Sequence, residues 1–538
     1  MPPACGRGRL AERSNIPMSA STTTRPVTVT VGTGPVSFDD VVAVARHDAP
    51  VLVADEALAE VRRSRAVIES LADDSQPHYG VSTGFGALAT RHIPVELRAQ
   101  LQRSLVRSHA AGSGAEVERE VVRALMLLRI STLATGRTGV REETLGTYVA
   151  MLNAGITPVV HEYGSLGCSG DLAPLAHCAL ALMGEGVVRD ARGERMPTAE
   201  AFAAAGISPV ELREKEGLAL INGTDGMLGQ LVLAITDLRL LLTTADITAA
   251  MSVEAQLGTD DVFAADLHAL RPQPGQALSA ENLRTLMQGS GIRESHRTEA
   301  CTRVQDAYSL RCSPQVAGAV RDTVSYAAQV AGFELASAVD NPVVTPDGRV
   351  ESNGNFHGAP VAYVLDFLAI VAADLASISE RRTDRFLDTS RNHGLNAFLA
   401  DDPGVDSGHM IAQYTQAAIV SEMKRLAAPA SVDSIPSSAM QEDHVSMGWS
   451  AARKLRRSVD GLTRVLAVEL LTAARAIELR APEQPSPATG AVVRALRDAG
   501  APGPGTDRFL APEIETAVEL VASGGAVAAA EAVTGPLN

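Results

Sequence analysis

The sequence predicts a mainly α-helical protein with an elongated central bundle of long helices. Composition is the first indication, because 46% of the 538 residues are hydrophobic but only 3% are aromatic. A core of that composition consists mostly of alanine, leucine and valine, whose small side chains suit closely packed helices. Periodicity is the second indication, since apolar residues recur at helical spacing over several long segments. Helices of about 25 residues or more are typical of extended bundles that assemble into oligomers.

The N-terminal part, at residues 26–210, mixes helical segments with several glycine-rich loops. Within it, residues 27–31 alternate in polarity and predict a short strand. The preceding residues 1–25 carry arginines but no apolar stretch, so they predict a disordered tail and not a secretory signal. Met18 is a second candidate for the first residue, after Met1.

The central bundle is expected at residues 211–485, with helices at about 227–257 and 360–384. Another helix should begin at Ser313-Pro314, because serine favours the N-cap and proline favours the first helical position. Two apolar stripes at helical spacing extend along this part of the chain. They consist of Val316, Val320, Val324, Ala327, Ala331 and Leu335, and of Leu455, Val459, Leu462, Leu466, Leu470, Ala473 and Ile477.

The C-terminal part follows a concentration of proline and glycine at residues 482–505. Such a concentration predicts a break in the helical pattern. We therefore expect a separate C-terminal helical segment at 486–538, which includes an alanine-rich stretch at 523–532.

Charge, hydropathy and cysteine content argue against several classes of function. The net charge of −16 disfavours a nucleic-acid partner, which needs a basic surface. The most apolar stretch, 361–378, contains Asp366 and Asp374, so a membrane span is not expected. Five cysteines without a C-x-x-C pair favour neither a disulfide framework nor a zinc site, and they fit a protein of the reducing cytoplasm.

The tripeptide Cys168-Ser169-Gly170 lies in a glycine-rich loop, GSLGCSGDLAPL, at residues 164–175. A glycine amide nitrogen can attack the carbonyl carbon two residues earlier and close a five-membered ring. Loss of water from the ring and from the serine side chain then leaves an exocyclic methylene. This group is a strong electrophile of a kind that none of the twenty amino acids supplies.

The alternative interpretation of these residues is a glycine-rich turn that leads into a helix. Asp171 would then lie near the helix N-terminus and Pro174 in its first turn. The flanking residues favour ring closure, since Gly164, Gly167 and Gly170 permit a compressed backbone. A helix that begins after Asp171 would also place the positive end of its dipole beneath the ring, where negative charge develops.

Residues 164–177, GSLGCSGDLAPLAH, resemble the signature of the aromatic amino acid ammonia-lyases and aminomutases. The resemblance implies the ammonia-lyase fold and a 4-methylideneimidazol-5-one prosthetic group formed from Cys168, Ser169 and Gly170. Most family members have alanine where this chain has Cys168, but the ring uses only the backbone carbonyl of that residue. Pyridoxal phosphate is not expected, because it needs a lysine Schiff base and none of the three lysines, Lys215, Lys424 and Lys454, lies in a glycine-rich phosphate-binding context. No metal is required.

Tyr79 begins a second segment, YGVSTGFG. Gly84, Gly86 and Ala89 match a dinucleotide-binding pattern, but no strand-turn-helix unit with a downstream acidic residue surrounds them. A surface loop is the other interpretation. In the family this segment is a mobile lid whose tyrosine is proposed as the base, which assigns that role to Tyr79. Because a tyrosine pKa is normally about 10, such a base needs positive charge nearby.

Ser108-His109 and Asn222 are candidates for substrate contacts. Taken alone, the histidine could be structural and the asparagine could mark a turn that interrupts a helix. By resemblance, the Ser-His pair contacts the substrate side chain and so determines specificity. Histidine-specific members typically have Ser-His here, whereas tyrosine and phenylalanine lyases have His-Leu or Phe-Leu. The Asn222 amide would contact the ring and the substrate amine. The family often has glutamine after Thr224, where this chain has Asp225.

Residues 305–311, QDAYSLR, form another candidate group. An amino acid substrate needs a bidentate carboxylate clamp, which arginine provides geometrically and lysine does not. A helix-capping arginine is the structural alternative. The family pattern Q-D-x-Y-S-x-R assigns the clamp to Arg311, a substrate contact to Gln305 and proton handling to Tyr308, as a second candidate beside Tyr79.

Phe356, in NGNFHG, and Glu442, in QEDHVSM, complete the set. By resemblance, Phe356 packs against the ring. Histidine-specific members carry glutamate at the position of Glu442, where phenylalanine lyases usually carry glutamine, and a carboxylate can hydrogen-bond an imidazole ring. The acidic residues and histidines here invite a metal-site interpretation, but the spacings H-x-x-x-H and H-E-x-x-H are missing.

The six segments occur in family order over residues 79–447. The resemblance implies conversion of L-histidine to trans-urocanate and ammonia, with the methylene from Ser169 as the electrophile. Tyr79, Tyr308 or Glu442 would remove the β-proton. The resemblance also implies a homotetramer in which three chains build each site. A tyrosine ammonia-lyase or tyrosine 2,3-aminomutase is the nearest alternative, and a non-catalytic helical scaffold with an uncyclised tripeptide is another.

Overall fold

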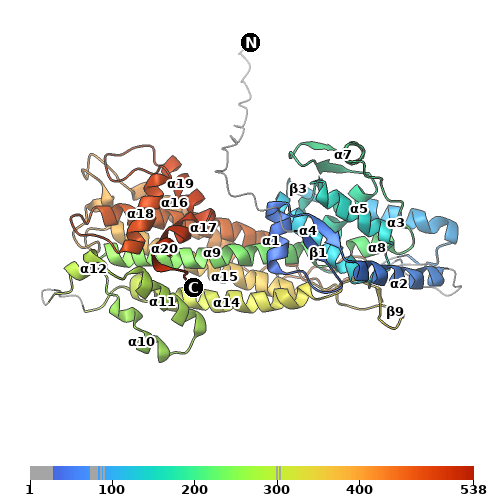
Figure 1. Cartoon of the computed structure of the whole chain (residues 1–538), viewed down its shortest axis with the longest axis horizontal. Helices are drawn as coiled ribbons and strands as arrows, with labels where there is room; N and C mark the ends of the chain where they lie inside the picture. Colours follow the sequence, from blue (N-terminus) through green and yellow to red (C-terminus); the bar gives the residue numbers. More distant parts are fainter. Residues whose placement is uncertain (1–27, 73–82, 85–87, 89–90, 299–300, 302–303) are drawn as a thin grey trace, which may run out of the picture.

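The computed structural model of the chain describes residues 28–72, 83–84, 88, 91–298, 301 and 304–538. The predicted tail at 1–25, both candidate start residues and Tyr79 lie outside these residues. Figure 1 shows an elongated molecule in which long helices connect two broader ends. The predicted mainly α-helical fold is confirmed, since the described strands are only two to four residues long.

The N-terminal elements gather at one end of the molecule (Figure 1). Their bounds are β1 Val29–Val31, α1 Phe38–His47, β2 Val51–Val53, α2 Asp55–Ala72, α3 Val95–His109, β3 Ser113–Glu116, α4 Arg119–Ala134, α5 Glu142–Asn153, β4 Thr157–Pro158, β5 His161–Tyr163, α6 Leu172–Leu182, β6 Val187–Arg189, β7 Arg195–Pro197, α7 Thr198–Ala205 and α8 Glu216–Ile221. The strand expected at 27–31 is confirmed as β1, which pairs in parallel with β2. β3 pairs with β5, and β4, β6 and β7 form a small antiparallel sheet.

The central elements extend along the molecule. Their bounds are α9 Asp225–Ala255, a 3-10 turn Asp261–Phe263, α10 Ala265–Ala269, α11 Pro274–Leu286, α12 Gly291–Ser295, α13 Tyr308–Arg311, α14 Ser313–Leu335, β8 Val343–Val344, β9 Val350–Glu351, α15 Ala359–Leu387, a second 3-10 turn Ala397–Leu399, α16 Met410–Leu426 and α17 Gly448–Glu478. Helices α9, α14, α15 and α17 pack against one another as a bundle. The helices expected at about 227–257 and 360–384 correspond to α9 and α15.

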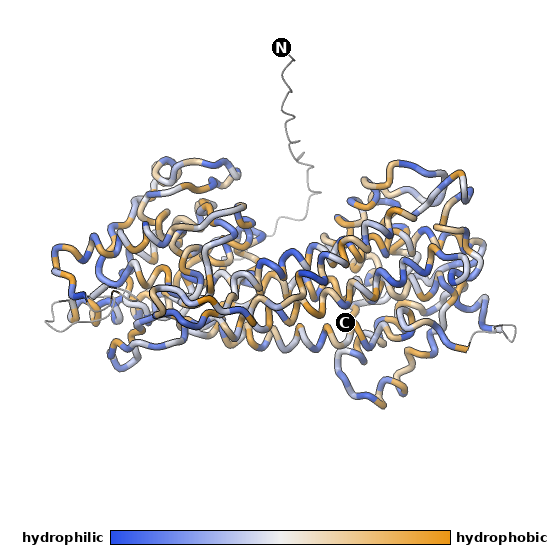
Figure 2. Tube along the Cα trace, turned by 180° about the vertical axis from the view of Figure 1, so that it is seen from behind, coloured by the Kyte–Doolittle hydropathy of each residue, from blue (hydrophilic) through white to orange (hydrophobic). Residues whose placement is uncertain are grey.

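Apolar residues recur along the bundle helices in Figure 2. The two predicted stripes lie on α14 and α17, and every member is buried except Val316, which is half-buried. A buried ion pair crosses the same core, because Arg382 of α15 donates to Glu469 of α17 at 2.8 Å. Ser379 and Ser252 also donate to this carboxylate, at 2.6 and 2.7 Å. The charge in the core is therefore fully compensated.

Two local expectations differ from the structure. Helix α14 begins at Ser313 itself, so Cys312 and not Ser313 is the N-cap, and no side chain caps the helix; the Ser313 hydroxyl donates instead to carbonyl oxygens of α13. The break expected at 482–505 contains a helix, α18 Pro487–Asp498, whose N-cap Ser486 accepts from Thr489 N at 3.1 Å. Pro487 therefore starts a helix and does not extend the break. The remaining helices are α19 Ala511–Ala522 and α20 Gly525–Thr534.

Helix α15 is long and apolar enough to cross a membrane by length and composition, as is the bent pair of α19 and α20 taken together. However, 61% of the most apolar window of α15 is buried inside the protein. Asp366 of this helix is buried and accepts from Lys454 Nζ at 2.5 Å and from Ser431 N at 2.7 Å. These contacts are those of a core helix in the bundle.

Candidate active site

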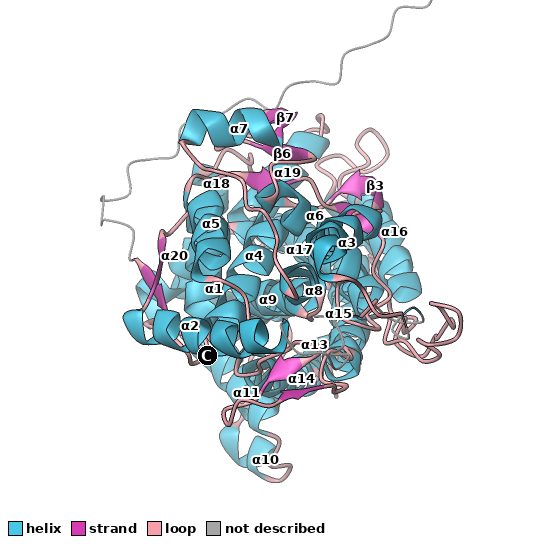
Figure 3. Ribbon diagram, turned by 90° about the vertical axis from the view of Figure 1, so that its right-hand side faces the viewer, coloured by secondary structure: helices cyan, strands magenta, loops and turns pink. Residues whose placement is uncertain are grey.

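The Cys168-Ser169-Gly170 loop lies between β5 and α6, at the end of the bundle that faces the viewer in Figure 3. Gly170 has φ +76°, and a β-carbon on it would lie 2.0 Å from the carbonyl oxygen of Gly223. The backbone nitrogen of Asp171 donates to this same oxygen at 2.7 Å. Only glycine fits at position 170, because the loop is pressed against the turn that precedes α9.

Arg129 supports that turn from inside the protein. Its fully buried guanidinium donates to the carbonyl oxygens of Ala219, Asn222 and Val339 at 3.1 to 3.2 Å. Asp225 lies 3.3 Å from the same guanidinium. The aspartate at this position, where the family often has glutamine, thus supplies the countercharge to a cation that would otherwise be buried alone.

Asp171 lies beneath the loop at the start of α6. It accepts from Ser165 Oγ at 2.9 Å and from Met227 N at 2.8 Å. Complete burial raises the pKa of Asp171 to about 7, and the nearby Asp225 adds to the increase. The helix expected after Asp171 is confirmed as α6, so the positive end of its dipole lies next to the tripeptide.

The loop is compatible with the predicted ring. Gly167 has φ +68°, and a β-carbon on it would lie 2.2 Å from Ser446 Oγ, which donates to the Gly167 carbonyl oxygen at 2.8 Å. Gly167 before the tripeptide and Gly170 at its end therefore both have a left-handed backbone, which glycine adopts without strain. A β-carbon at Gly167 or Gly170 would collide with neighbouring atoms, so both positions need glycine. This glycine-dependent loop fits the ring that would form from the backbone of residues 168–170.

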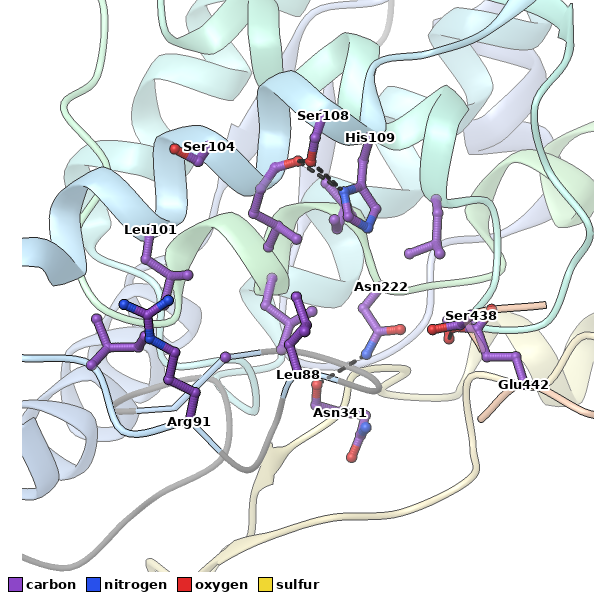
Figure 4. Close-up of a pocket in the computed structure, with 17 residues that line it drawn as sticks. Leu88, Arg91, Leu101, Ser104, Ser108, His109, Asn222, Asn341, Ser438 and Glu442 are labelled. Atoms are coloured by element: carbon purple, nitrogen blue, oxygen red, sulfur yellow. Dashed lines mark hydrogen bonds between the residues drawn. The ribbon is translucent and has the colours of Figure 1, made fainter. Parts of the chain in front are cut away.

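Ser169 lines a cavity of about 550 Å³ at this end of the bundle. Figure 4 shows His109, Asn222 and Glu442 directed toward this space from three different elements. Apolar side chains form much of the remaining wall, so a ligand there would be largely removed from water. The other lining residues are Gly84, Leu88, Arg91, Ile93, Leu101, Ser104, Leu105, Ser108, Leu172, Leu218, Ile221, Asn341 and Ser438.

His109 ends α3 and presents its ring to the cavity. Its Nδ1 lies 2.9 Å from the carbonyl oxygen of Leu105, which can only accept, so this contact assigns the proton to Nδ1. Nε2 is then left as an acceptor in the neutral ring. Burial lowers the pKa of His109, which favours that neutral form.

Glu442 contacts the tripeptide directly although 272 positions or more separate them in the sequence. Its Oε2 accepts from Cys168 Sγ at 3.1 Å and from Ser437 Oγ at 3.1 Å, and its Oε1 accepts from Ser169 Oγ at 3.3 Å. The intervening residues 438–440 all have positive φ, between 51° and 69°. Non-glycine residues in this region are strained, and such strain is common where a side chain is held for function.

Two further predicted residues lie around the loop. Asn222 Nδ2 donates to the carbonyl oxygen of Asn341 at 3.0 Å, which fixes its amide in the cavity wall. Phe356 is half-buried in the segment before α15, and Gly358 N of that segment donates to the Gly167 carbonyl oxygen at 3.2 Å. The Phe356 segment is thus attached to the loop that carries the tripeptide.

Gln305, Tyr308 and Arg311 lie elsewhere. Arg311 ends the short helix α13, and its Nε donates to the Asp306 carbonyl oxygen at 2.9 Å. Its guanidinium carbon lies 4.6 Å from the centroid of the Tyr308 ring. Tyr308 is 71% exposed. Asp306 accepts from Thr259 N, just beyond the C-terminal end of α9. Since α9 has 31 residues, its two ends lie about 45 Å apart. Within one chain, the predicted carboxylate clamp is therefore at the opposite end of the bundle from Ser169.

Sequence reasoning missed several residues that build this site. Ser438 and Asn341 line the cavity, and no motif pointed to them. Lys215 and Asp340 form a fully buried ion pair at 2.5 Å next to Asn341, and Lys215 also donates to the Thr138 carbonyl oxygen. Arg129 could have been identified from the sequence as a buried, structurally important residue, because it is a lone arginine in an otherwise apolar stretch of α4.

Within the described ranges, no group of three or more histidine, cysteine, aspartate or glutamate side chains could hold a metal ion. The cysteines Cys168, Cys178, Cys301 and Cys312 are free thiols. Burial raises the pKa of Cys168 and of Cys178 to about 12, so neither is a ready thiolate.

A bundle of long helices with a compressed Cys-Ser-Gly loop at one end defines a carbon–nitrogen lyase with the ammonia-lyase and aminomutase fold. A Streptomyces griseus protein named histidine ammonia-lyase is 68% identical, over 95% of this chain and 99% of its own length. Residues 36–498 match the aromatic amino acid lyase family, and the chain belongs to it.

Two solved structures share the fold closely. A tyrosine aminomutase from Streptomyces globisporus has a TM-score of 0.89 at 38% identity, over 95% of this chain and 100% of that chain. A histidine ammonia-lyase from Trypanosoma cruzi has a TM-score of 0.86 at 37% identity, over 94% of this chain and 95% of that chain. The fold is thus shared by enzymes whose names give different substrates.

Proposed function

We propose that this protein eliminates ammonia from L-histidine to give trans-urocanate, the first step of histidine degradation. The observation that carries the proposal is the placement of Glu442 and His109 in the cavity that contains Ser169. The carboxylate suits the N–H group of an imidazole ring, and together with the acceptor nitrogen of His109 it suits the two N–H groups of the imidazolium form; a phenyl ring offers neither. The 68% identity with a relative named histidine ammonia-lyase supports the same substrate.

The chemical problem is the β-proton of histidine, which is not acidic. The 4-methylideneimidazol-5-one that Cys168, Ser169 and Gly170 would form would supply an electrophile for the substrate amine. Glu442 and His109 hold the imidazole and Asn222 contacts the amine. The proton at Cβ moves to Tyr79, Tyr308 or Glu442, and the Cα–N electron pair leaves with ammonia.

The remaining substrate contacts come from the far end of the bundle. Arg311 clamps the carboxylate, and Gln305 and Tyr308 lie on the same segment. Since about 45 Å separates that segment from Ser169 in one chain, a site containing both needs more than one chain. Phe356, on the loop beside Gly167, packs against the ring.

We assign the assembly as a homotetramer in which three chains contribute to each site. Large apolar side chains exposed on α14, α15 and α16 support it, because contacts between chains would bury them. They are Tyr326 and Phe333 of α14, Tyr363, Phe367 and Ile370 of α15, and Ile411 and Tyr414 of α16. We place the enzyme in the cytoplasm, where free thiols such as those of the described cysteines persist.

The test is incubation of the purified protein with L-histidine while the absorbance of urocanate is followed. Turnover of L-histidine is expected, with an intact mass lower by two waters than the sequence mass. Ser169→Ala should abolish turnover and restore the sequence mass. Turnover of tyrosine alone would contradict the proposal.

The alternative substrate is tyrosine, as in an ammonia-lyase or a 2,3-aminomutase. The observation in its favour is the TM-score of 0.89 with a tyrosine aminomutase. Ser108-His109 and Glu442 argue against it, because by resemblance both are typical of histidine-specific members, and a relative with that name is 68% identical. Chromatographic analysis for β-tyrosine and coumarate in the same incubation separates the two functions.

A further inference from the structure

Cys168 is the ring-forming residue whose side chain takes no part in the ring. Ring closure joins the Gly170 amide nitrogen to the Cys168 carbonyl carbon, and the serine hydroxyl of residue 169 leaves as water. The Cys168 thiol stays in place throughout. Cys168 is 6% exposed and packs beside Val445 and Met447 on one side. On the other side its sulfur reaches Glu442 Oε2 at 3.1 Å.

The two oxygens of Glu442 have different partners among the described residues. Oε2 accepts from both Cys168 Sγ and Ser437 Oγ, each at 3.1 Å. Oε1 accepts from Ser169 Oγ at 3.3 Å, and this is the hydroxyl that ring formation removes. After ring formation, Oε2 keeps both donors, while Oε1 loses its donor and becomes available to a ligand in the cavity.

The chemistry of Cys168 suits a donor and not a nucleophile. Burial, and then the neighbouring Glu442 carboxylate, raises the pKa of Cys168 to about 12, so the thiol keeps its proton at neutral pH. A thiol is a weak hydrogen-bond donor, and a bond to a charged acceptor is stronger than one to a neutral acceptor. Alanine, which most family members have at this position, could not make this contact.

We propose that Cys168 is a positioning residue for Glu442: its thiol holds Oε2, so that Oε1 faces the substrate side chain. The inference rests on the proposed function, because Glu442 is assigned there to the imidazole of L-histidine. The Ser437 hydroxyl, which precedes the left-handed turn at 438–440, donates to the same carboxylate oxygen from the loop of Glu442 itself. Cys168 and Ser437 thus hold one oxygen between two loops.

The first experiment measures binding without turnover. In full-length Ser169→Ala protein, which cannot form the methylene, Oε1 has also lost the serine donor. Calorimetry with L-histidine should give a dissociation constant about fivefold higher when Cys168→Ala is added, since one hydrogen bond of about 1 kcal/mol is lost. Cys168→Ser in the same background should restore affinity to within about twofold, because its hydroxyl can donate to Oε2.

The second experiment uses the ring-containing protein. Cys168→Ala should retain an intact mass lower by two waters and raise KM for L-histidine about fivefold, with a smaller change in kcat. In a Glu442→Gln background, Cys168→Ala should have little further effect on KM.

Cys178→Ala is the matched control, since Cys178 is also buried, lies on α6, and does not contact Glu442. It should leave affinity and KM for L-histidine unchanged. Equal affinity and KM in Cys168→Ala and the parent protein would overturn the proposal, as would ring formation that fails in Cys168→Ala but survives in Cys168→Ser. A parent protein that does not turn over L-histidine would instead contradict the proposed function.

Discussion

The two ends of the bundle carry different parts of the predicted site. The end with the N-terminal elements holds Ser169, His109, Asn222 and Glu442 around one cavity. The other end holds Arg311, whose guanidinium donates to a backbone carbonyl and stacks on an exposed tyrosine. The first end can receive an electrophile and an imidazole but has no assigned carboxylate clamp. In the proposed function the second end supplies the clamp and no electrophile, so the length of α9 would make catalysis depend on assembly.

Mixed assemblies test this division most strongly. Ser169→Ala alone should abolish turnover, and Arg311→Met alone should lower kcat/KM at least about 100-fold, because a charged contact to the substrate carboxylate is lost. Co-expression of the two variants should restore a measurable fraction of wild-type activity, since some sites would then combine an intact loop with an intact clamp. Assay of co-purified heterotetramers, each chain carrying a different tag, gives the answer. Co-assembled chains that remain inactive would show that both residues act within one chain.

Gly170→Ala should have the next largest effect, confined to the loop end. The new β-carbon would lie 2.0 Å from the Gly223 carbonyl oxygen, and φ is +76°. We expect the tripeptide to keep both waters by intact mass and the free energy of unfolding to fall by about 3 kcal/mol or more. Gly193→Ala is the matched control, because Gly193 has φ +83° but no atom within 4 Å of the new β-carbon. The Gly193→Ala protein should have an intact mass lower by two waters than its sequence mass. The same decrease in the Gly170→Ala protein would refute the steric argument.

The buried ion pair beside the cavity should contribute more to the free energy of unfolding than an exposed ion pair does. Lys215→Met leaves Asp340 charged and without its partner at full burial, which should lower the free energy of unfolding by about 3–5 kcal/mol. Asp347→Asn, which breaks the exposed pair with Arg349, should have no measurable effect in the same urea titration. Similar small losses for both substitutions would mean that the Lys215–Asp340 pair is not dehydrated.

The smallest expected effect is on the pH dependence of the free energy of unfolding, to which one histidine at each end of the bundle contributes. Burial lowers the pKa of His177, near the loop, to about 4, with His161 adding to the decrease, and burial lowers that of His409, at the far end, to about 3. Both values are below the usual 6.5, so each histidine destabilises the fold as the pH falls below about 6.5. Between pH 7 and pH 5 we expect a loss of about 1–2 kcal/mol for each. His409→Gln should flatten this dependence in thermal unfolding, and an unchanged slope would contradict the assignment.

Much of the fold follows from local pattern. The stripes on α14 and α17 and the apolar runs of α9 and α15 are periodic in the sequence itself, so the long helices could be predicted. The start of α14 and the helix α18 inside the proline-rich stretch could not, because each depends on which hydroxyl or carbonyl lies nearby once the chain is packed. Helix boundaries cannot be predicted from the sequence where several neighbouring residues could cap the helix equally well.

The candidate site divides in the same way. The residue types could be predicted, because ring formation needs Gly170 and Ser169 in adjacent positions and the other segments carry a recognisable family pattern. Their grouping could not be predicted: His109, Asn222 and Glu442 come from three elements, and Asn341 and Ser438 join them without any motif.

The sequence alone determined the helical class, the compressed loop and the identity of the chemical groups, since all three depend on neighbouring residues. Only the tertiary structure decided that Gly170 is pressed against Gly223, that Cys168 and Ser437 share one oxygen of Glu442, and that Arg311 lies about 45 Å away along α9. These are contacts and distances between distant segments, and periodicity along a chain carries no information about which distant segments meet.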